Sequence, residues 1–324
     1  MTVPGDPDPT EAAAAGGLPV KRLLLVLGVV ATAYAAVLLV WGDSPQASLA
    51  RLWTWTGLQA AALCVLNYLL RGVRWRLWMA HYGRHFGWLQ GLRLYLAGYA
   101  FTPTPGNVGE AMRGLMLSSQ PLGTAQSLAI FGAERLADLL CLLLMAVPAL
   151  WWGWNHGFMQ ALLGKYLFAM AFVAISLAVV MAVAIWMLRR QLGALLGRVE
   201  WLREAWQCLS LQPVVWFGLT LAAWLAQGLA VWLICRDFSI EAGLFTSAGF
   251  YAVAMVAGAL SALPAGLGGM EAVLTGLLVA AGAAAGVALS VTVLVRLLTL
   301  WLAVAIGLAA LLYSAAVRRE ISFR

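Results

Sequence analysis

The sequence predicts an all-α integral membrane protein with about six spanning helices and two re-entrant helix hairpins that form an inverted repeat. The first observation is composition: 63% of the 324 residues are hydrophobic and 10% are charged, whereas soluble domains are about 25% charged. The second is a series of apolar runs long enough to cross a bilayer. The third is a pair of apolar segments broken by Pro and Gly. The surplus apolar surface must face lipid, which excludes a soluble enzyme, a nucleic-acid module and a disulfide scaffold.

The charged and metal-ligating residues do not favour another class. The net charge of +7 would suggest nucleic acid in a soluble chain, but here the basic residues gather between apolar runs, so no nucleic-acid partner is expected. The four cysteines are far apart and are interpreted as small core side chains. His81 and His85 have a helical metal-ligand spacing without a nearby third ligand. We expect neither a metal nor a cofactor.

The elements follow in order along the chain. Residues 1–21 are rich in Pro, Gly, Asp and Ala and predict a disordered cytoplasmic tail, and residues 22–324 predict one polytopic membrane domain. Residues 192–209 mix apolar and charged positions and are expected along the inner membrane surface. Six long apolar runs predict membrane spans: residues 23–41, 52–70, 124–152, 166–188, 214–235 and 287–313.

Two further apolar segments, residues 88–117 and 244–281, are interrupted by helix-breaking residues. Each half is too short to span the bilayer comfortably. Proline removes a backbone donor, and broken helices survive at membrane depth only where protein or water satisfies the freed backbone groups. We therefore predict two re-entrant hairpins. Their turn residues are Pro103, Pro105, Gly106 and Gly109 in the first, and Pro264, Gly266, Gly268 and Gly269 in the second.

Arginine clusters predict the orientation. They follow the second and fourth predicted spans and end the chain, and the positive-inside rule puts such clusters in the cytoplasm. Both termini are therefore expected inside. The first cluster contains Arg71, Arg74, Arg76, Arg84 and Arg93.

An internal repeat relates the two broken segments by a shift of 161 positions (264 − 103). The shift superposes Pro103 on Pro264, Glu110-Ala111 on Glu271-Ala272, and Arg135-Leu136 on Arg296-Leu297. The repeat units cover about residues 52–152 and 213–314. Three crossings separate the two units, and an odd number inverts the second, as in many alternating-access transporters.

Four charged residues of the repeat are expected at membrane depth. Glu110 and Glu271 follow the Gly-rich turns, where a carboxylate can simply cap a helix N-terminus or form a functional site. Arg135 and Arg296 each lie 25 positions after their own Glu (135 − 110 and 296 − 271), which suggests that each hairpin packs against the span that follows it. Arginine is well suited to bidentate phosphate binding.

Glu134 and Asp138 are spaced i, i+4 and face nearly the same side of a helix. They could relay protons, because burial and neighbouring like charges raise carboxyl pKa values. A salt-bridge cluster with Arg135 or Arg113 is an equally good interpretation. Thr299 stands at the position of Asp138 in the second repeat, so a proton role would be asymmetric.

These motifs resemble a known family. Residues 262–272, residues 99–113 (with Pro103, Gly109, Glu110 and Arg113) and Glu134-Arg135 are similar to signatures of the flippase-like transmembrane family that includes the membrane domain of bacterial lysylphosphatidylglycerol synthase/flippase. The resemblance covers about residues 20–315. It implies that an anionic or aminoacylated phospholipid, or a lipid-linked molecule, moves between leaflets of the bacterial cytoplasmic membrane.

The resemblance also sets expectations for the site and the reaction. The substrate-binding candidates are Glu110, Arg113, Arg135, Glu271 and Arg296. Bifunctional members carry a soluble aminoacyl-transfer domain after the membrane part, whereas this chain ends at Arg324, so lipid synthesis is not expected of it.

Other functions stay open. These are a membrane-embedded transferase or hydrolase that uses Glu134, Asp138 or Glu271, a small-solute or ion transporter, and a membrane partner of a separate lipid-modifying enzyme. A homodimer is also left open.

Overall fold

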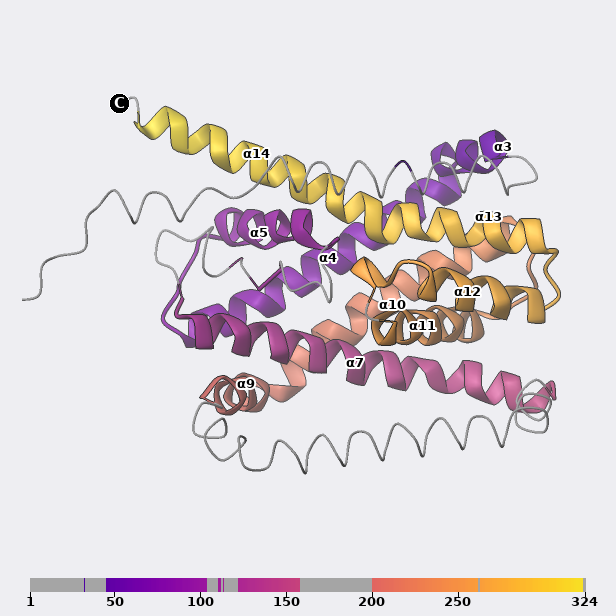
Figure 1. Cartoon of the computed structure of the whole chain (residues 1–324), viewed down its shortest axis with the longest axis horizontal. Coiled ribbons are helices and arrows are strands. Elements are labelled where there is room, and N and C mark those ends of the chain that lie inside the picture. The colour runs from indigo at the N-terminus through magenta and orange to yellow at the C-terminus, as the bar shows by residue number, and fades with distance from the viewer. Residues whose placement is uncertain are drawn as a thin grey trace, which may run out of the picture. The chain divides into compact units, whose positions relative to one another are not determined.

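The computed structural model describes Thr32 and residues 45–103, 110–111, 113, 122–157, 200–261 and 263–322. The chain divides into residues 1–40 and 41–324, and the helices discussed below belong to the second unit. All regular elements in the described ranges are helical (Figure 1). Several predicted features lie outside those ranges: the tail, the spans 23–41 and 166–188 except Thr32, and the turn residues Pro105, Gly106 and Gly109.

The α-helices are α3 (Pro45–Ala50), α4 (Trp55–His81), α5 (Trp88–Ala97), α7 (Thr124–Asn155), α9 (Glu200–Ser210), α10 (Pro213–Asp237), α11 (Leu244–Leu260), α12 (Gly269–Ala280), α13 (Ala285–Arg296) and α14 (Leu302–Ser322).

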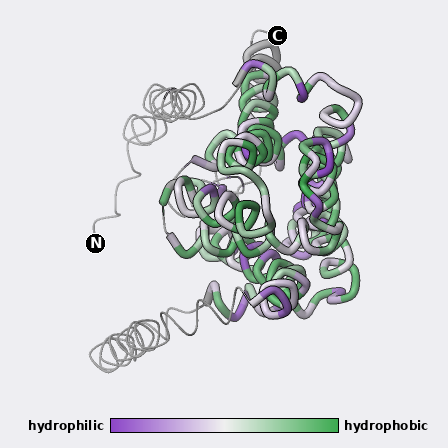
Figure 2. Tube along the Cα trace, turned by 90° about the vertical axis from the view of Figure 1, so that its right-hand side faces the viewer, coloured by the Kyte–Doolittle hydropathy of each residue, from purple (hydrophilic) through white to green (hydrophobic). Residues whose placement is uncertain are grey.

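Three of the described helices are long and apolar enough to cross a membrane. They cover Thr124–Asn155, Pro213–Asp237 and Ala285–Ser314, which agrees with three of the predicted spans. Most of the described helical tube in Figure 2 is green, the colour of hydrophobic residues. Leucines such as Leu140 and Leu143 on α7 are about half exposed. Such a surface is suited to lipid rather than water.

Helix α4 differs from its predicted span. We expected residues 52–70 followed by a loop with an arginine cluster, but the helix continues to His81. Arg71 and Arg74 are 7% and 0% exposed, so they are not inner-loop charges as predicted. The helix continues because both guanidinium groups turn inward and find partners on other helices. Composition alone could not reveal this, because hydropathy cannot tell a paired buried arginine from a solvated one.

The second broken segment forms two short helices that pack against each other, α11 and α12. At 17 and 12 residues, both are shorter than the roughly 20 residues that a spanning helix needs. The break contains the 3₁₀ turn η4 (Pro264–Gly266) and left-handed backbone at Ala265, Gly266 and Gly268 (φ 54°, 66° and 84°). A Cβ on Gly266 would lie 3.0 Å from the backbone of Gly258, so the turn needs glycine there both for its φ and for close packing.

The first broken segment begins with α5 and continues as the 3₁₀ helix η2 (Gly98–Phe101). Beyond Pro103, the described part of its second arm consists of Glu110, Ala111 and Arg113. The η2 segment lies close against α14, since a Cβ on Gly307 would be 2.4 Å from the backbone nitrogen of Ala100. Glycine at position 307 therefore lets the two backbones touch.

Helix α4 packs along α10 in the opposite direction. At one end Arg51, in the 3₁₀ turn η1 (Arg51–Trp53), pairs with Asp237 at 2.8 Å. At the other end the indole of Trp78 donates to the carbonyl of Cys208 at 2.9 Å. The two contacts fix the antiparallel pairing along its whole length.

The first arm of each broken segment packs against the long helix that follows the other one. Helix α5 and η2 pack on α14, and α11 packs on α7. Helices α7 and α13 begin 161 positions apart (285 − 124), which is the sequence shift of the repeat. The α13–α14 run and α7 also have opposite chain directions (Figure 1).

A π-helical turn, η5 (Leu297–Trp301), separates α13 from α14 directly after Arg296. Such a turn replaces the i→i+4 backbone hydrogen bonds of an α-helix with i→i+5 bonds. The hydroxyl of Tyr68 donates to the carbonyls of Leu298 and Thr299 at 2.8 and 3.2 Å. Helix α4 therefore stabilises the irregular part of the last spanning helix.

All four cysteines are free and buried, which confirms their interpretation as core side chains. Cys208 on α9 lies 3.5 Å from the Tyr82 hydroxyl. Burial raises the pKa of the Cys208 thiol. Burial, followed by its contact with Cys208, also raises the pKa of Tyr82. Both groups therefore stay neutral at physiological pH.

Candidate functional site

Seven charged side chains meet inside the helix bundle, and we call them the arginine–carboxylate cluster. They come from α4, from the second arm of the first broken segment and from α7. Six of them have side chains that are at most 9% exposed. Charges so well removed from water are tolerated only when they are paired. The members are Arg71, Arg74, Glu110, Arg113, Glu134, Arg135 and Asp138.

Asp138 is the most heavily bonded carboxylate of the cluster. It accepts hydrogen bonds from Arg71 at 2.7 Å and Arg74 at 2.8 Å. The indole of Trp224 on α10 adds a third bond at 3.2 Å. Arg74 also donates to the hydroxyl of Thr220 at 2.9 Å. The carboxylate therefore joins α4, α7 and α10.

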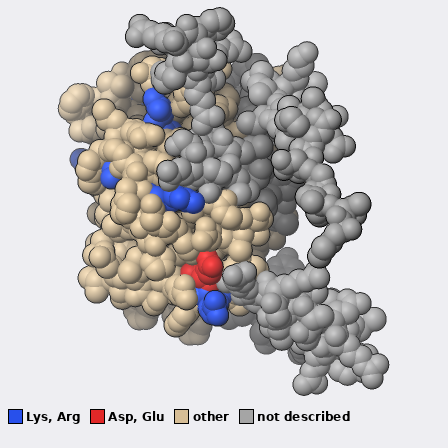
Figure 3. All heavy atoms as spheres, turned by 90° about the vertical axis from the view of Figure 1, so that its left-hand side faces the viewer, with Lys and Arg blue, Asp and Glu red and all other residues tan. Residues whose placement is uncertain are grey.

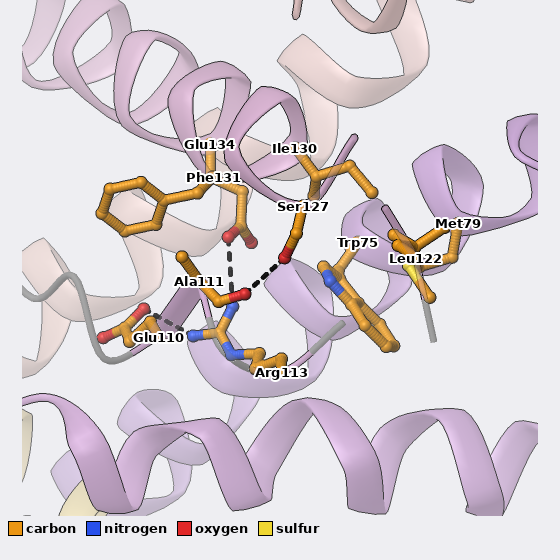
Figure 4. A pocket seen from close by; sticks show the side chains of 10 residues that line it. All are labelled: Trp75, Met79, Glu110, Ala111, Arg113, Leu122, Ser127, Ile130, Phe131 and Glu134. Carbon is orange, nitrogen blue, oxygen red and sulfur yellow. Dashed lines mark hydrogen bonds and ion pairs between the residues drawn. The ribbon is translucent and has the colours of Figure 1, made fainter. Parts of the chain in front are cut away.

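Arg113 bridges the other two carboxylates (Figure 4). Its guanidinium donates to Glu110 at 2.5 Å and to Glu134 at 3.0 Å, and it lies 4.4 Å from the ring centroid of Tyr95. A Cβ on Gly98 would be only 2.0 Å from the Nε of Arg113. The first broken segment thus provides space for the guanidinium by placing a glycine beside it.

Arg135 is the exception in this cluster. Its side chain is 32% exposed, and its contacts with Glu110 and Asp138 are long, at 3.4 and 3.5 Å. The cluster contains one more arginine than carboxylates. The excess positive charge is therefore most accessible at Arg135.

A small pocket lies against this cluster (Figure 4). Its volume of about 10 Å³ is close to the minimum for one water molecule. One wall is apolar and includes Trp75 and Met79, while the other carries Glu110, Arg113 and Glu134. An oxygen of Glu134 is buried there without a hydrogen-bond partner. As the described residues form it, this pocket is too small for a lipid headgroup.

A second, smaller site connects the second broken segment with α13. Arg296 donates to Glu271 at 2.6 Å and to the carbonyl of Ala265 at 2.9 Å. The other oxygen of Glu271 accepts the backbone N–H of Gly268 at 2.8 Å. Glu271 therefore caps α12 and also pairs with Arg296. The helix-capping role is compatible with a place in a charged site.

Aromatic residues connect the two sites. Tyr99 lies 5.5 Å from the guanidinium of Arg113 and 5.2 Å from the ring of Tyr68. Tyr68 in turn binds the carbonyl of Leu298, two residues after Arg296. The polar groups of both sites thus belong to one continuous, tightly packed interior.

Both predicted Glu–Arg pairs are in contact, Glu110 with Arg135 and Glu271 with Arg296. Glu134, Asp138 and Arg113 also join the first site, as expected for a salt-bridge cluster. The sequence predicted similar roles for Arg135 and Arg296. Arg296 is only 3% exposed and donates short hydrogen bonds through two of its nitrogens, so the two arginines are not equivalent in the structure.

Arg71 and Arg74 were missed as members of the site. The signal that could have found them is periodicity. Asn67, Arg71, Arg74 and Trp78 recur at helical spacing and so share one face with buried residues. Among the described residues, no group of three potential metal ligands occurs.

Comparison with known proteins assigns the chain to a protein family. The profile of the family described as "Lysylphosphatidylglycerol synthase TM region" matches residues 24–307. The chain belongs to this family. The lysylphosphatidylglycerol synthase TM-region family is a membrane protein family, in agreement with the apolar spanning helices.

A relative from Methanothermobacter thermautotrophicus (strain Delta H), described as a UPF0104 membrane protein, is 31% identical over 91 residues. The matched part covers 28% of this chain and 27% of the relative. The chain thus matches about a quarter of the length of this curated relative, which supports the membrane class.

Proposed function

We propose that this chain moves a phospholipid or lipid-linked molecule between the leaflets of the bacterial cytoplasmic membrane. The observation that carries the proposal is the arginine–carboxylate cluster with its excess positive charge at Arg135. A headgroup phosphate crosses hydrocarbon slowly because its charge loses hydration. A polar interior that offers an arginine lowers that barrier, while the acyl chains stay in lipid.

Each part of the polar interior has its own role. Arg135 binds the phosphate first, because it is the most exposed arginine of the cluster and its contacts with Glu110 and Asp138 are long. The phosphate replaces the long contacts to Glu110 and Asp138. Arg113 and Arg74 keep Glu110, Glu134 and Asp138 in place. Arg296 binds later, when the second broken segment moves and releases it from Glu271.

The fold suits alternating access. We infer an inverted repeat in which α4 corresponds to α10 and α7 to α13–α14. The antiparallel pairing of α4 with α10 supports this inference, and so does the reciprocal packing of α5 on α14 and α11 on α7. The two broken segments would be re-entrant hairpins from opposite faces. Transporters of this architecture bind substrate where broken helices meet.

Orientation follows from the basic residues. Lys and Arg side chains appear at several points of the face on the left of Figure 1 (Figure 3). The C-terminal end of α4 and helix α9 lie at that end of the bundle. By the positive-inside rule this end, with the C-terminal end of α14, is cytoplasmic. The N-terminus lies outside the described residues, and its cytoplasmic placement stays a prediction from the sequence.

The test is lipid exchange in vesicles reconstituted with purified protein. Phosphatidylglycerol labelled in one leaflet reports its arrival in the other. We expect Arg135→Gln, Glu271→Gln and Arg296→Ala each to reduce the exchange rate at least about tenfold, the effect of about 1.4 kcal/mol on a barrier. Wild-type rates in all three folded variants would refute the site.

The matched control is Arg236→Gln, which removes an exposed arginine that lies 5.6 Å from the Trp232 ring, and we expect it to leave exchange unchanged. The same vesicles separate transport from other functions. A chemically altered lipid would indicate a transferase or hydrolase, and uptake of a soluble tracer without lipid exchange would indicate a solute transporter.

A further inference from the structure

A groove opens between α5 and α14. Its volume is about 650 Å³, within the usual range of ligand pockets. Five of its residues come from α5, and Ala310 and Tyr313 come from α14. None of them belongs to the arginine–carboxylate cluster, so the groove is a different site.

The walls of the groove are apolar with one polar edge. Leu89, Leu92 and Leu96 line one side of it. Gln90 and Arg93 contribute its amide and its positive charge, and Tyr313 contributes a hydroxyl group. A largely apolar groove with a cationic edge is complementary to a molecule that has an acyl chain and an anionic head.

Arg93 is available for such a molecule. Its guanidinium lies 5.4 Å from the ring centroid of Tyr313, which holds the side chain at the edge of the groove. Its Nε is buried and has no hydrogen-bond partner. In the part of the chain that the structure describes, no carboxylate forms an ion pair with Arg93. A cation beside hydrocarbon is costly unless an anion accompanies it.

We propose that this groove binds one anionic phospholipid, with its phosphate on Arg93 and Gln90 and an acyl chain along the leucines of α5. Charge complementarity favours this occupant over a zwitterionic lipid, whose own cationic headgroup would lie near Arg93. Tyr313 positions the arginine at the depth of the headgroup, where tyrosines are enriched. The binding does not depend on leaflet exchange and can be tested without it.

The experiment uses the full-length protein in nanodiscs of equimolar phosphatidylglycerol and phosphatidylcholine. Either lipid carries a photoreactive group in its acyl chain, and crosslinked peptides are mapped by mass spectrometry. We expect phosphatidylglycerol to label α5 and α14 several times more than phosphatidylcholine does. Arg93→Gln should lower the ratio of phosphatidylglycerol to phosphatidylcholine labelling about fivefold, which is the effect of one arginine at an anionic surface.

Three further variants sharpen the result. Arg93→Lys keeps the charge and should retain most of the preference. Ala310→Trp fills the groove and should reduce labelling by both lipids. Arg236→Gln, a surface arginine outside the groove, should change nothing.

Equal labelling by both lipids that survives Arg93→Gln would overturn the proposal, because the groove would then hold ordinary bulk lipid. Crosslinks from the groove to residues 22–41 in place of lipid would also overturn it, because the chain itself would be the occupant.

Discussion

At the residue scale, the charged interior depends on side chains that leave space as well as on those that carry charge. Gly98 has ordinary helical dihedrals, so alanine suits its backbone, but the added methyl would lie 2.0 Å from Arg113 Nε. Gly98→Ala should therefore push Arg113 away from Glu110 and Glu134. Breaking a buried ion pair costs about 3–5 kcal/mol, so we expect a clearly lower melting temperature in detergent.

The matched control for this prediction is Gly218→Ala on α10. Nothing lies within 4 Å of the Cβ that it would add, and alanine favours a helix interior over glycine by about 1 kcal/mol. Its melting temperature should be unchanged or slightly higher. Equal melting temperatures for the two variants would contradict the role assigned to Gly98.

At the element scale, the sequence predicts the helices that are defined by a long apolar run. It does not predict the helix ends that depend on ion pairs between residues distant in sequence. The spans at residues 124–152, 214–235 and 287–313 are confirmed, because about 20 successive apolar residues have few other solutions. The predicted end of the span at residue 70 was wrong, because the burial of Arg71 and Arg74 depends on Asp138, a residue distant in sequence. The contact of Arg296 with Glu271 was predictable, since the repeat marks both residues.

The π-helical turn η5 gives the prediction for this scale. Hydropathy contains no signal for it, and its carbonyls depend on Tyr68 of α4. Tyr68→Phe leaves the carbonyls of Leu298 and Thr299 without this donor, which should cost about 1–3 kcal/mol in a buried site. Denaturation of the purified protein measures the loss. Tyr313→Phe, which alters an exposed tyrosine, should cost nothing, and a similar loss in both variants would contradict the assignment.

At the scale of the whole molecule, apolar helices surround an interior that is charged but closed. The arginine–carboxylate cluster ties α4, α7 and α10 together, while Glu271 and Arg296 hold α12 against α13. Each broken segment therefore adheres to the spanning helices through ion pairs that an anionic ligand can replace. A headgroup phosphate at Arg135 would compete with Glu110 for the guanidinium and so loosen the first segment. Under the proposed function, cargo binding and opening would be the same event.

The whole-molecule prediction concerns topology. The Arg51–Asp237 pair and the Trp78–Cys208 contact lie at opposite ends of the α4–α10 pair, so the loop after α4 and the loop after α10 should face opposite compartments. Cysteines introduced at the exposed positions His85 and Glu241 test this with an impermeant maleimide on spheroplasts. The native cysteines are buried and contribute little background.

We expect Glu241→Cys to react at once and His85→Cys only after permeabilisation, because the arginines at the His85 end keep it in the cytoplasm. Equal reactivity of both positions from outside would refute the crossing of α4 and α10. Reversed reactivity would invert the orientation but keep the antiparallel pair. The experiment thus separates the architecture, which the helix contacts support, from its direction in the membrane, which rests on the basic residues alone.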